Sequence, residues 1–333
     1  MKELLRSAVI AASGGLSESQ LRSFARYSLN GASVALCLHR VAQTRRPGEW
    51  DPSLTIAPGE LDALIEFLLS TRPRTQSWLT VAFDDGYEDA AQYILTSIDR
   101  FPTVEWIYFV CPEKIEHRVG FRWDLFEQKQ KAGIPVDFDA VMFGDLDVEA
   151  ENRRSDLKGL CTLPEYRLAD VDLCRELHRL PRVSLGNHTN GHFCQTLLTL
   201  NQASEEYRRS VSDFARLFGP QSHFAFPFGT PQESFEQRHV SELRARGSFT
   251  IWSTEQRPYA PGERKPGAVL PRYPIDGTRT WRQSAFSIAL YAAKWRMRGT
   301  RFTWPDERDA SRLRVGVGGR MFRDPASGGG RAR

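Results

Sequence analysis

Short apolar runs alternate with helix-forming stretches along most of this 333-residue chain. The runs are rich in β-branched and aromatic residues, which is typical of strands that are buried on both faces. They occur at 34–38, 79–83, 106–110, 182–186, 224–229, 248–253 and 269–273, and the helical stretches at 58–69, 89–99 and 201–218. This alternation predicts a parallel α/β sheet, either open or closed into a barrel.

Two adjacent acids, Asp84 and Asp85, follow the strand predicted at 79–83 and precede Gly86. Acidic side chains are rarely buried without a partner, so we expect a cation beside them. Successive strand side chains point to opposite faces, and both acids can serve one site only if the chain bends there, which Gly86 allows. Taken alone, the segment is equally consistent with solvated acids at an ordinary strand end.

Histidines follow two other predicted strands. His39 comes after 34–38, whereas His188 and His192 come after 182–186. The carboxyl ends of parallel strands open on one face, so these residues are expected to converge with the acid pair. Histidines four residues apart share a face if they lie on one helical turn, and they can then bind one metal ion.

Two imidazoles and one carboxylate form a suitable zinc site with open positions, and the second carboxylate is then available as a base. A metal ion in such a site activates water, so the predicted chemistry is metal-assisted hydrolysis. For an amide or ester substrate, the backbone N–H of Phe228, just past Pro227, is a candidate donor to the tetrahedral intermediate.

Three segments occur in order: Phe83-Asp84-Asp85-Gly86, His188-Thr189-Asn190-Gly191-His192 and Phe226-Pro227-Phe228-Gly229. Together they resemble the three principal motifs of the polysaccharide deacetylases, a family of carbohydrate esterases, and the resemblance spans about residues 33–275. It implies a distorted (β/α) barrel and the removal of N-acetyl groups from amino sugars in a polysaccharide or glycan precursor. The implied partner is therefore an N-acetylated glycan.

The resemblance also implies roles for individual residues. Asp84 matches the family's catalytic base, and Phe228 matches the residue whose backbone amide supports the oxyanion. Asp85, His188 and His192 match the ligands of a divalent metal. Zn²⁺ is the expected ion, although the same ligands accept Co²⁺, Mn²⁺ or Ni²⁺.

The chain departs from the family pattern in two places. Ala225 stands where many members have an arginine that orients the base, and Arg272 is the candidate substitute, with a surface salt bridge as its alternative role. The family's late Leu-x-His motif, which supplies a general acid, has no counterpart because no histidine follows His239. His39 is the candidate acid, with a structural role as the alternative.

We expect an N-terminal helical extension at 1–30 and a barrel at 31–280 with a mainly helical insertion at 112–180. The region 281–333 is expected to be an amphipathic, basic tail with a disordered end. Residues 286–298 are apolar and then basic, which predicts either a helix packed on the barrel or weak contact with a membrane surface.

The net charge of +4 conceals an asymmetry, since residues 294–333 carry eleven Lys/Arg against four Asp/Glu. The remainder is near −3, and we infer no nucleic-acid binding. Five widely spaced cysteines without a CxxC motif indicate reduced thiols. With no convincing signal peptide and no run of 18 apolar residues, a cytoplasmic protein, at most peripheral to a membrane, is expected.

Two other functions fit the same residues. The loss of two family features leaves room for a catalytically inactive carbohydrate-binding domain of the same fold. A related amide hydrolase that acts on a small non-sugar substrate is the third possibility. The intact set Asp84, Asp85, His188 and His192 favours the deacetylase.

Overall fold

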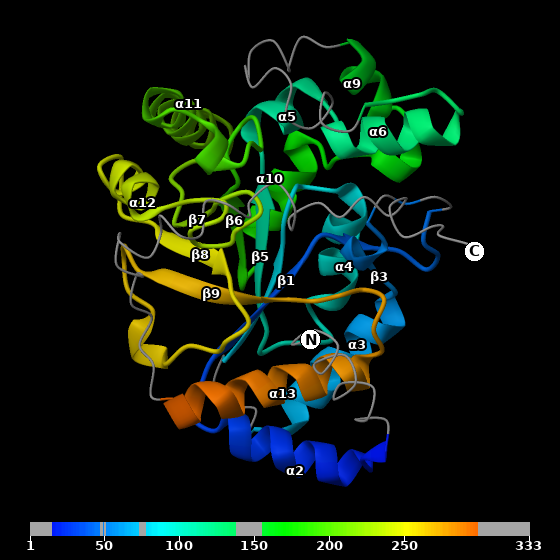
Figure 1. The fold of residues 1–333 in the computed structure, drawn as a ribbon, viewed down its shortest axis with the longest axis vertical. Coiled ribbons are helices and arrows are strands. Elements are labelled where there is room, and N and C mark those ends of the chain that lie inside the picture. Colours follow the sequence, from blue (N-terminus) through cyan, green and yellow to red (C-terminus); the bar gives the residue numbers. More distant parts are fainter. Residues whose placement is uncertain (1–14, 47–48, 50, 73–77, 138–154, 299–333) are drawn as a thin grey trace, which may run out of the picture.

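Seven parallel strands close into a barrel that is surrounded by helices (Figure 1). The computed structural model describes residues 15–46, 49, 51–72, 78–137 and 155–298. In barrel order the strands are β1 (Val34–Leu38), β4 (Leu79–Phe83), β5 (Glu105–Val110), β6 (Val183–Asn187), β7 (His223–Ala225), β8 (Thr250–Thr254) and β9 (Val269–Pro274), and β9 pairs with β1. The predicted (β/α) barrel is confirmed.

The helices that pack around the barrel connect consecutive strands. They are α3 (Pro58–Ser70), α4 (Glu88–Ser97), α10 (Val171–Arg179), α11 (Leu200–Phe218) and α12 (Gln237–Arg244). Two further helices, α2 (Glu18–Leu29) and α13 (Trp281–Arg298), lie side by side at the lower end of the molecule (Figure 1). Helix α2 falls within the extension predicted at 1–30, whose first fourteen residues lie outside the described ones.

The segment between β5 and β6 is mainly helical in its described part. It contains α5 (Pro112–His117), α6 (Arg122–Lys131), α9 (Ser155–Leu160), the 3₁₀ turn η3 (Pro164–Tyr166) and α10. These helices, apart from α10, gather at the upper end of the barrel, opposite α2 and α13 (Figure 1). The described part of 112–180 thus carries these helices, and the division of the chain with an insertion at 112–180 stays a prediction; residues 138–154 lie outside the described ones.

The barrel interior is apolar near its middle and polar at its upper end. One buried cluster contains Ala35, Ala82, Ile107, Phe109, Ala225, Trp252, Tyr259 and Leu270. Two positions after members of this cluster come Cys37, Asp84 and Arg272. Alternate strand residues share a face, so these three side chains are buried inside the barrel above the cluster. Strand alternation thus explains why these polar side chains face the barrel interior at the carboxyl ends of the strands.

Three details differ from the sequence predictions. The strand predicted at 224–229 ends at Ala225, because Pro227 has no N–H for a strand ladder. A small separate sheet of β2 (Arg40–Val41) and β3 (Thr55–Ile56) was not predicted, nor was α12.

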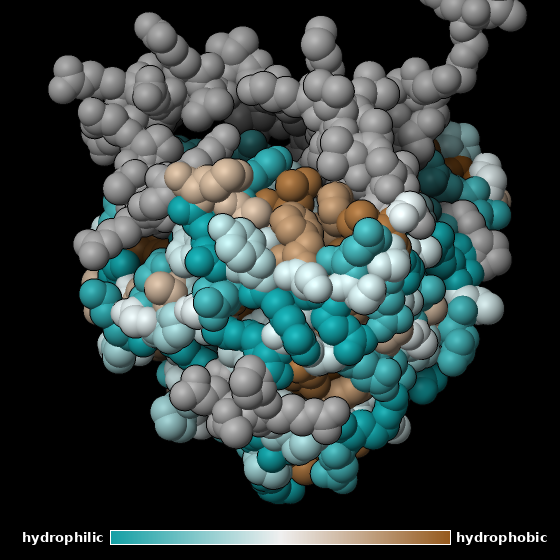
Figure 2. Space-filling view, turned by 90° about the horizontal axis from the view of Figure 1, so that it is seen from below, coloured by the Kyte–Doolittle hydropathy of each residue, from teal (hydrophilic) through white to brown (hydrophobic). Residues whose placement is uncertain are grey.

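Helix α13 packs into the fold through one apolar face. Its buried apolar residues are Ala285, Ile288, Ala289 and Ala292, and Phe286 packs against Phe24 of α2. At the outer side Tyr27 is 71% exposed and Met297 is 79% exposed. Viewed from below, the surface is mostly hydrophilic with one larger hydrophobic area (Figure 2). The predicted disordered end of the tail lies outside the described residues.

No helix in the described ranges is long and apolar enough to cross a membrane. All five cysteines are buried free thiols, as their spacing predicted.

A buried neutral histidine in β7 makes the stability of the fold depend on pH. Trp252 Nε1 donates to His223 Nδ1 over 3.2 Å, and burial lowers the pKa of His223 to about 4. Unfolded histidine binds a proton near pH 6.5, so the unfolded state binds more protons between these values. Acidification through this range should therefore cost up to about 3 kcal/mol through this residue.

We expect His223→Asn, which keeps an acceptor for Trp252, to flatten that pH dependence in urea unfolding measured from pH 7 to pH 4. His117→Asn is the control because His117 is exposed, and it should leave the pH dependence unchanged. Identical profiles for wild type and His223→Asn would contradict the assignment.

Candidate metal centre

The two adjacent acids at the end of β4 face one site because the backbone turns at Asp85. Asp84 still belongs to the barrel, where its N–H donates to Leu38 O. Asp85 has φ = 75° and Gly86 has φ = 86°, so the left-handed turn begins one residue before the predicted position. A left-handed aspartate costs about 1 kcal/mol or more, and such conformations cluster at functional sites.

Asp84 is held by a buried bidentate ion pair with Arg272 of β9. Arg272 Nη1 donates to Asp84 Oδ1, and Nη2 donates to Oδ2 over 2.9 Å. Burial opposes ionisation of Asp84, but the guanidinium outweighs it and holds the pKa of the carboxyl well below its usual range. Arg272 is completely buried and also lies over the Phe109 ring. The alternative role predicted for Arg272, a surface salt bridge, is wrong because both partners are buried.

The segment 188–192 is an irregular loop, not the helical turn on which the spacing argument relied. Thr189 has φ = 67° and His192 has φ = 57°, and His192 N–H donates to Thr189 Oγ1. The loop nevertheless places the two imidazole centroids 4.9 Å apart, in an edge-to-face arrangement. Tight left-handed turns therefore replace helical periodicity in bringing His188 and His192 together.

A buried glutamate from α11 secures this loop. Glu206 Oε1 accepts hydrogen bonds from the backbone N–H groups of Asn190, over 2.8 Å, and Gly191, over 2.7 Å. Burial raises the pKa of Glu206 to about 7, so the carboxyl is close to half-ionised at neutral pH. This anchor was not identified from the sequence, where nothing distinguishes Glu206 from a surface helix residue.

Asp85, His188 and His192 form a cluster that fits a metal ion. Their ligand atoms all lie within 4.8 Å of one another, and all three residues are buried. Asp85 Oδ1 is 3.0 Å from His192 Nε2 and 3.6 Å from His188 Nε2. Ligand atoms around tetrahedral zinc are separated by roughly 3.3 Å, since each bond is about 2.0–2.2 Å long. Among the described residues Asp85 Oδ1 accepts no hydrogen bond, as expected of a ligand atom.

The protonation state of His188 suits metal binding. Its Nδ1 lies 2.8 Å from Ala225 O, a carbonyl that can only accept, so the proton is on Nδ1 and the Nε2 lone pair faces Asp85. Burial lowers the pKa of His188 to about 4, which keeps the ring neutral at physiological pH. Ala225, where the sequence lacks an arginine, contributes through its backbone instead.

The other two predicted site residues lie at the same end of the barrel. His39 is half-buried, and a ring nitrogen lies within 4.8 Å of both Asp84 and Cys37. Phe228 has φ = 62°, and its ring lies against His192 with centroids 5.3 Å apart. All seven predicted site residues thus belong to one end of the fold.

Comparison with known proteins depends on structure, because the sequence matches no family model and no curated protein. A polysaccharide deacetylase from Bacillus cereus is 16% identical, with a TM-score of 0.51 over 77% of this chain and 69% of that one. A de-N-acetylase from Aggregatibacter actinomycetemcomitans is 14% identical, with a TM-score of 0.51 over 76% and 99% of the two chains. A deacetylase from Streptococcus pyogenes, in complex with acetate, is 10% identical, with a TM-score of 0.51 over 77% and 98%.

The chain has the polysaccharide deacetylase fold. At these low identities the likeness describes the barrel alone, and the chemistry has to be argued from the residues of this chain. The resemblance inferred from three short motifs and the similarity of the whole fold point to the same family.

In this polysaccharide deacetylase fold, helix α6 lies against one side of the candidate metal centre. Trp123 of α6 lies edge-to-face on His192, with centroids 4.8 Å apart. Its indole N–H donates to Tyr87 Oη over 2.9 Å, and Tyr87 donates to the buried Asp124 over 2.7 Å. The sequence offered Trp123 only as one of several aromatic candidates, because a contact between the insertion and the loop at 188–192 has no local pattern.

The remaining aromatic candidates belong to the core. Trp252 is fully buried inside the barrel, and Phe193 is 4% exposed beneath the Arg122 side chain. The Cys194 thiol makes hydrogen bonds with Thr196 Oγ1 and with nearby backbone carbonyls, in keeping with its predicted packing role.

Replacing Glu206 tests whether it holds the histidine loop. Glu206→Leu leaves two buried N–H groups without an acceptor, which should lower the free energy of unfolding by about 2–6 kcal/mol. We also expect metal affinity to fall about 10–100-fold, as for other residues that orient ligands. Urea unfolding and metal titration measure the two effects.

Glu206→Gln is the matched control because it retains an acceptor oxygen. It should stay close to the wild type in both measurements. Equal stability of the leucine and glutamine variants would show that the two hydrogen bonds are unimportant.

Proposed function

We propose that this protein is a metal-dependent hydrolase that removes N-acetyl groups from amino sugars in a polysaccharide or glycan precursor. The observation that carries the proposal is that two adjacent carboxylates, Asp84 and Asp85, have different partners. Asp85 faces the Nε2 atoms of two imidazoles, whereas Asp84 is paired with Arg272 and lies outside that trio. A binding domain has no need for an ionised carboxylate beside a metal site.

A divalent metal held by Asp85, His188 and His192 would supply Lewis-acid chemistry, polarising the amide carbonyl and acidifying water. Zinc fits this mixed nitrogen and oxygen ligand set, and cobalt, manganese or nickel can replace it. The hydrogen bond from His188 Nδ1 to Ala225 O fixes the ring and leaves Nε2 facing Asp85, which orients the ligand.

Asp84 is the proposed general base that removes the proton from the attacking water. Its Oδ1 accepts from Arg272 alone among the described residues, so one lone pair is available. Arg272 keeps the carboxylate ionised at neutral pH and fixes its plane. A bidentate guanidinium is well suited to this because its two N–H groups match the two oxygens.

His39 is the proposed general acid, which donates a proton to the leaving amine. It lies within 4.8 Å of Asp84 and is half-buried, so it is accessible to a bound substrate. The backbone N–H of Phe228 is proposed to donate to the oxyanion. Removal of the acetyl group then yields acetate and a free amino sugar.

Metal removal tests this function directly. The purified chain should release acetate from N-acetylglucosamine oligosaccharides, lose this activity with a chelator, and regain it with Zn²⁺ or Co²⁺. A parallel panel of small non-sugar amides distinguishes a glycan deacetylase from another amide hydrolase. If no substrate reacts at saturating zinc or cobalt, the inactive carbohydrate-binding domain becomes the better description.

Location and membrane contact are further proposals that accompany this function. Buried free thiols support a cytoplasmic protein, and the exposed Met297, with Lys294 and Arg296 on the same helix, supports weak contact with an anionic membrane surface. Vesicle flotation checks the contact, since Met297→Glu should reduce binding if this face touches lipid.

A further inference from the structure

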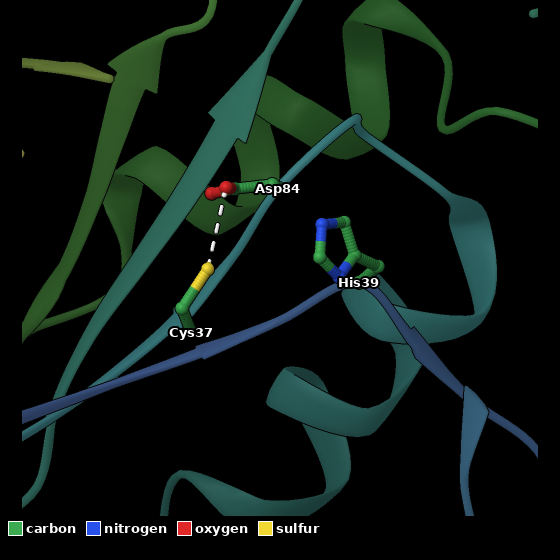
Figure 3. A group of neighbouring side chains, drawn as sticks. All are labelled: Cys37, His39 and Asp84. Carbon is green, nitrogen blue, oxygen red and sulfur yellow. Dashed lines mark hydrogen bonds between the residues drawn. The ribbon is translucent and has the colours of Figure 1, made fainter. Parts of the chain in front are cut away.

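A second group of potential ligands lies beside the proposed metal centre. Cys37, His39 and Asp84 each present one ligand atom, and these atoms lie within 4.8 Å of one another. Figure 3 shows Cys37 and Asp84 pointing toward each other from β1 and the end of β4, with His39 beside them at the end of β1. The three come from two paired strands, so the barrel itself holds them together.

The distance between Cys37 and Asp84 suits two neighbouring ligands of tetrahedral zinc. Cys37 Sγ donates to Asp84 Oδ2 over 3.5 Å. Zinc bonds of about 2.3 Å to sulfur and 2.0–2.2 Å to nitrogen or oxygen place neighbouring ligand atoms roughly 3.3–3.7 Å apart. Cys37 and Asp84 are buried and His39 is half-buried, so an ion would enter from the His39 side.

We propose that Cys37, His39 and Asp84 form a second zinc site, separate from the Asp85 site. On binding, a zinc–sulfur bond forms as the Cys37 S–H bond breaks, and the proton passes to solvent without any change in oxidation state. The thiolate gives this site a soft ligand that the Asp85 site lacks, and it favours zinc or cobalt over magnesium or calcium.

This second site is weaker than the first. The Arg272 guanidinium lies on Asp84 and repels an incoming cation, and so does a metal ion already bound by Asp85. The site should therefore fill only when zinc is in excess of one equivalent.

The consequence for activity rests on the proposed function. A zinc ion on Asp84 and His39 would occupy both the proposed base and the proposed acid, so excess zinc should inhibit the enzyme. Zinc binding can be measured without any activity, so the existence of the second site is tested separately from the proposed function.

Cobalt spectroscopy of the full metal-free chain tests the site. A cobalt–thiolate bond gives charge-transfer absorption in the near ultraviolet, which the Asp85 site cannot produce because it has no cysteine. We expect this band to grow only after the first equivalent of Co²⁺. Absence of the band at saturating cobalt overturns the proposal.

Cys37→Ala should lose the charge-transfer band but keep the visible bands of the first equivalent, which also shows that the variant is folded. Cys37→Ser, which preserves the side-chain volume more closely, serves if the alanine variant does not fold. Cys174→Ala, at another buried thiol in α10, should keep the band. A band that survives in both Cys37 variants assigns the thiolate to another residue and contradicts the site.

Inhibition is measured separately as acetate release against zinc concentration. Cys37→Ala should need at least tenfold more zinc than the wild type for half-inhibition. If no acetate is released at all, the proposed function fails, while the cobalt spectrum still decides whether the second site exists.

Discussion

Asp84→Asn should abolish most acetate release while the protein keeps its metal. Asparagine has nearly the same shape and can still accept from Arg272, but it cannot take a proton from water. Loss of a general base costs about 10²- to 10⁴-fold in rate. At one equivalent of zinc, metal content by elemental analysis should stay at the wild-type value, because Asp84 is not part of the Asp85, His188 and His192 trio.

Asp85→Asn is the matched variant, one residue along the chain. It removes the anionic ligand, so both metal content and activity should fall. The two variants together separate catalysis from metal binding in neighbouring carboxylates. At one equivalent of zinc, equal metal loss in both variants would show that Asp84 binds the first ion, and unchanged metal content in Asp85→Asn would remove Asp85 from the site.

Arg272→Met should destabilise the protein by about 3–5 kcal/mol at neutral pH, because it leaves the buried Asp84 charge unpaired. Urea unfolding measures this loss. In the wild type, Arg272 holds the pKa of Asp84 below its ordinary value, so the pair stabilises the fold above about pH 4 and loses its effect on acidification. In the variant, the guanidinium no longer offsets burial, the largest influence on Asp84, so the pKa of this carboxyl should rise.

The stability difference between wild type and Arg272→Met should therefore shrink as the pH falls through the raised pKa of Asp84 in the variant, where the unpaired carboxylate becomes neutral while wild-type Asp84 stays ionised. The acid limb of the activity profile should move to higher pH in the variant. Asp84→Asn in the Arg272→Met background should recover much of the lost stability, since it removes the unpaired charge. A difference that stays constant with pH would mean that the lost stability comes from packing of Arg272 on Phe109 and not from the ion pair.

The positions of the proposed catalytic groups could be predicted from the sequence because they depend on local patterns. Asp84, Asp85 and His188 each follow a buried apolar run, and a parallel barrel brings the ends of such runs to one face. Arg272 could be proposed in the same way, since it follows an apolar residue by two positions in the last strand.

The conformations of the same residues could not be predicted. The left-handed turn at Asp85 and the irregular loop at 188–192 are unfavourable for these residue types, and they persist because surrounding contacts hold them. Glu206, which holds the loop through two backbone N–H groups, lies on a helix whose pattern shows no sign of this task.

The order of strands and helices, the barrel class and the face on which the polar groups gather followed from periodicity, because alternation and strand ends are properties of neighbouring residues. Which of those groups meet was settled by closure of the barrel. Asp84 and Arg272 are 188 positions apart and touch because β1 pairs with both β4 and β9. The contacts of Trp123 with His192 and of Cys37 with Asp84 likewise join segments that are distant in the sequence. Contacts between distant segments depend on register and packing, which no local pattern records.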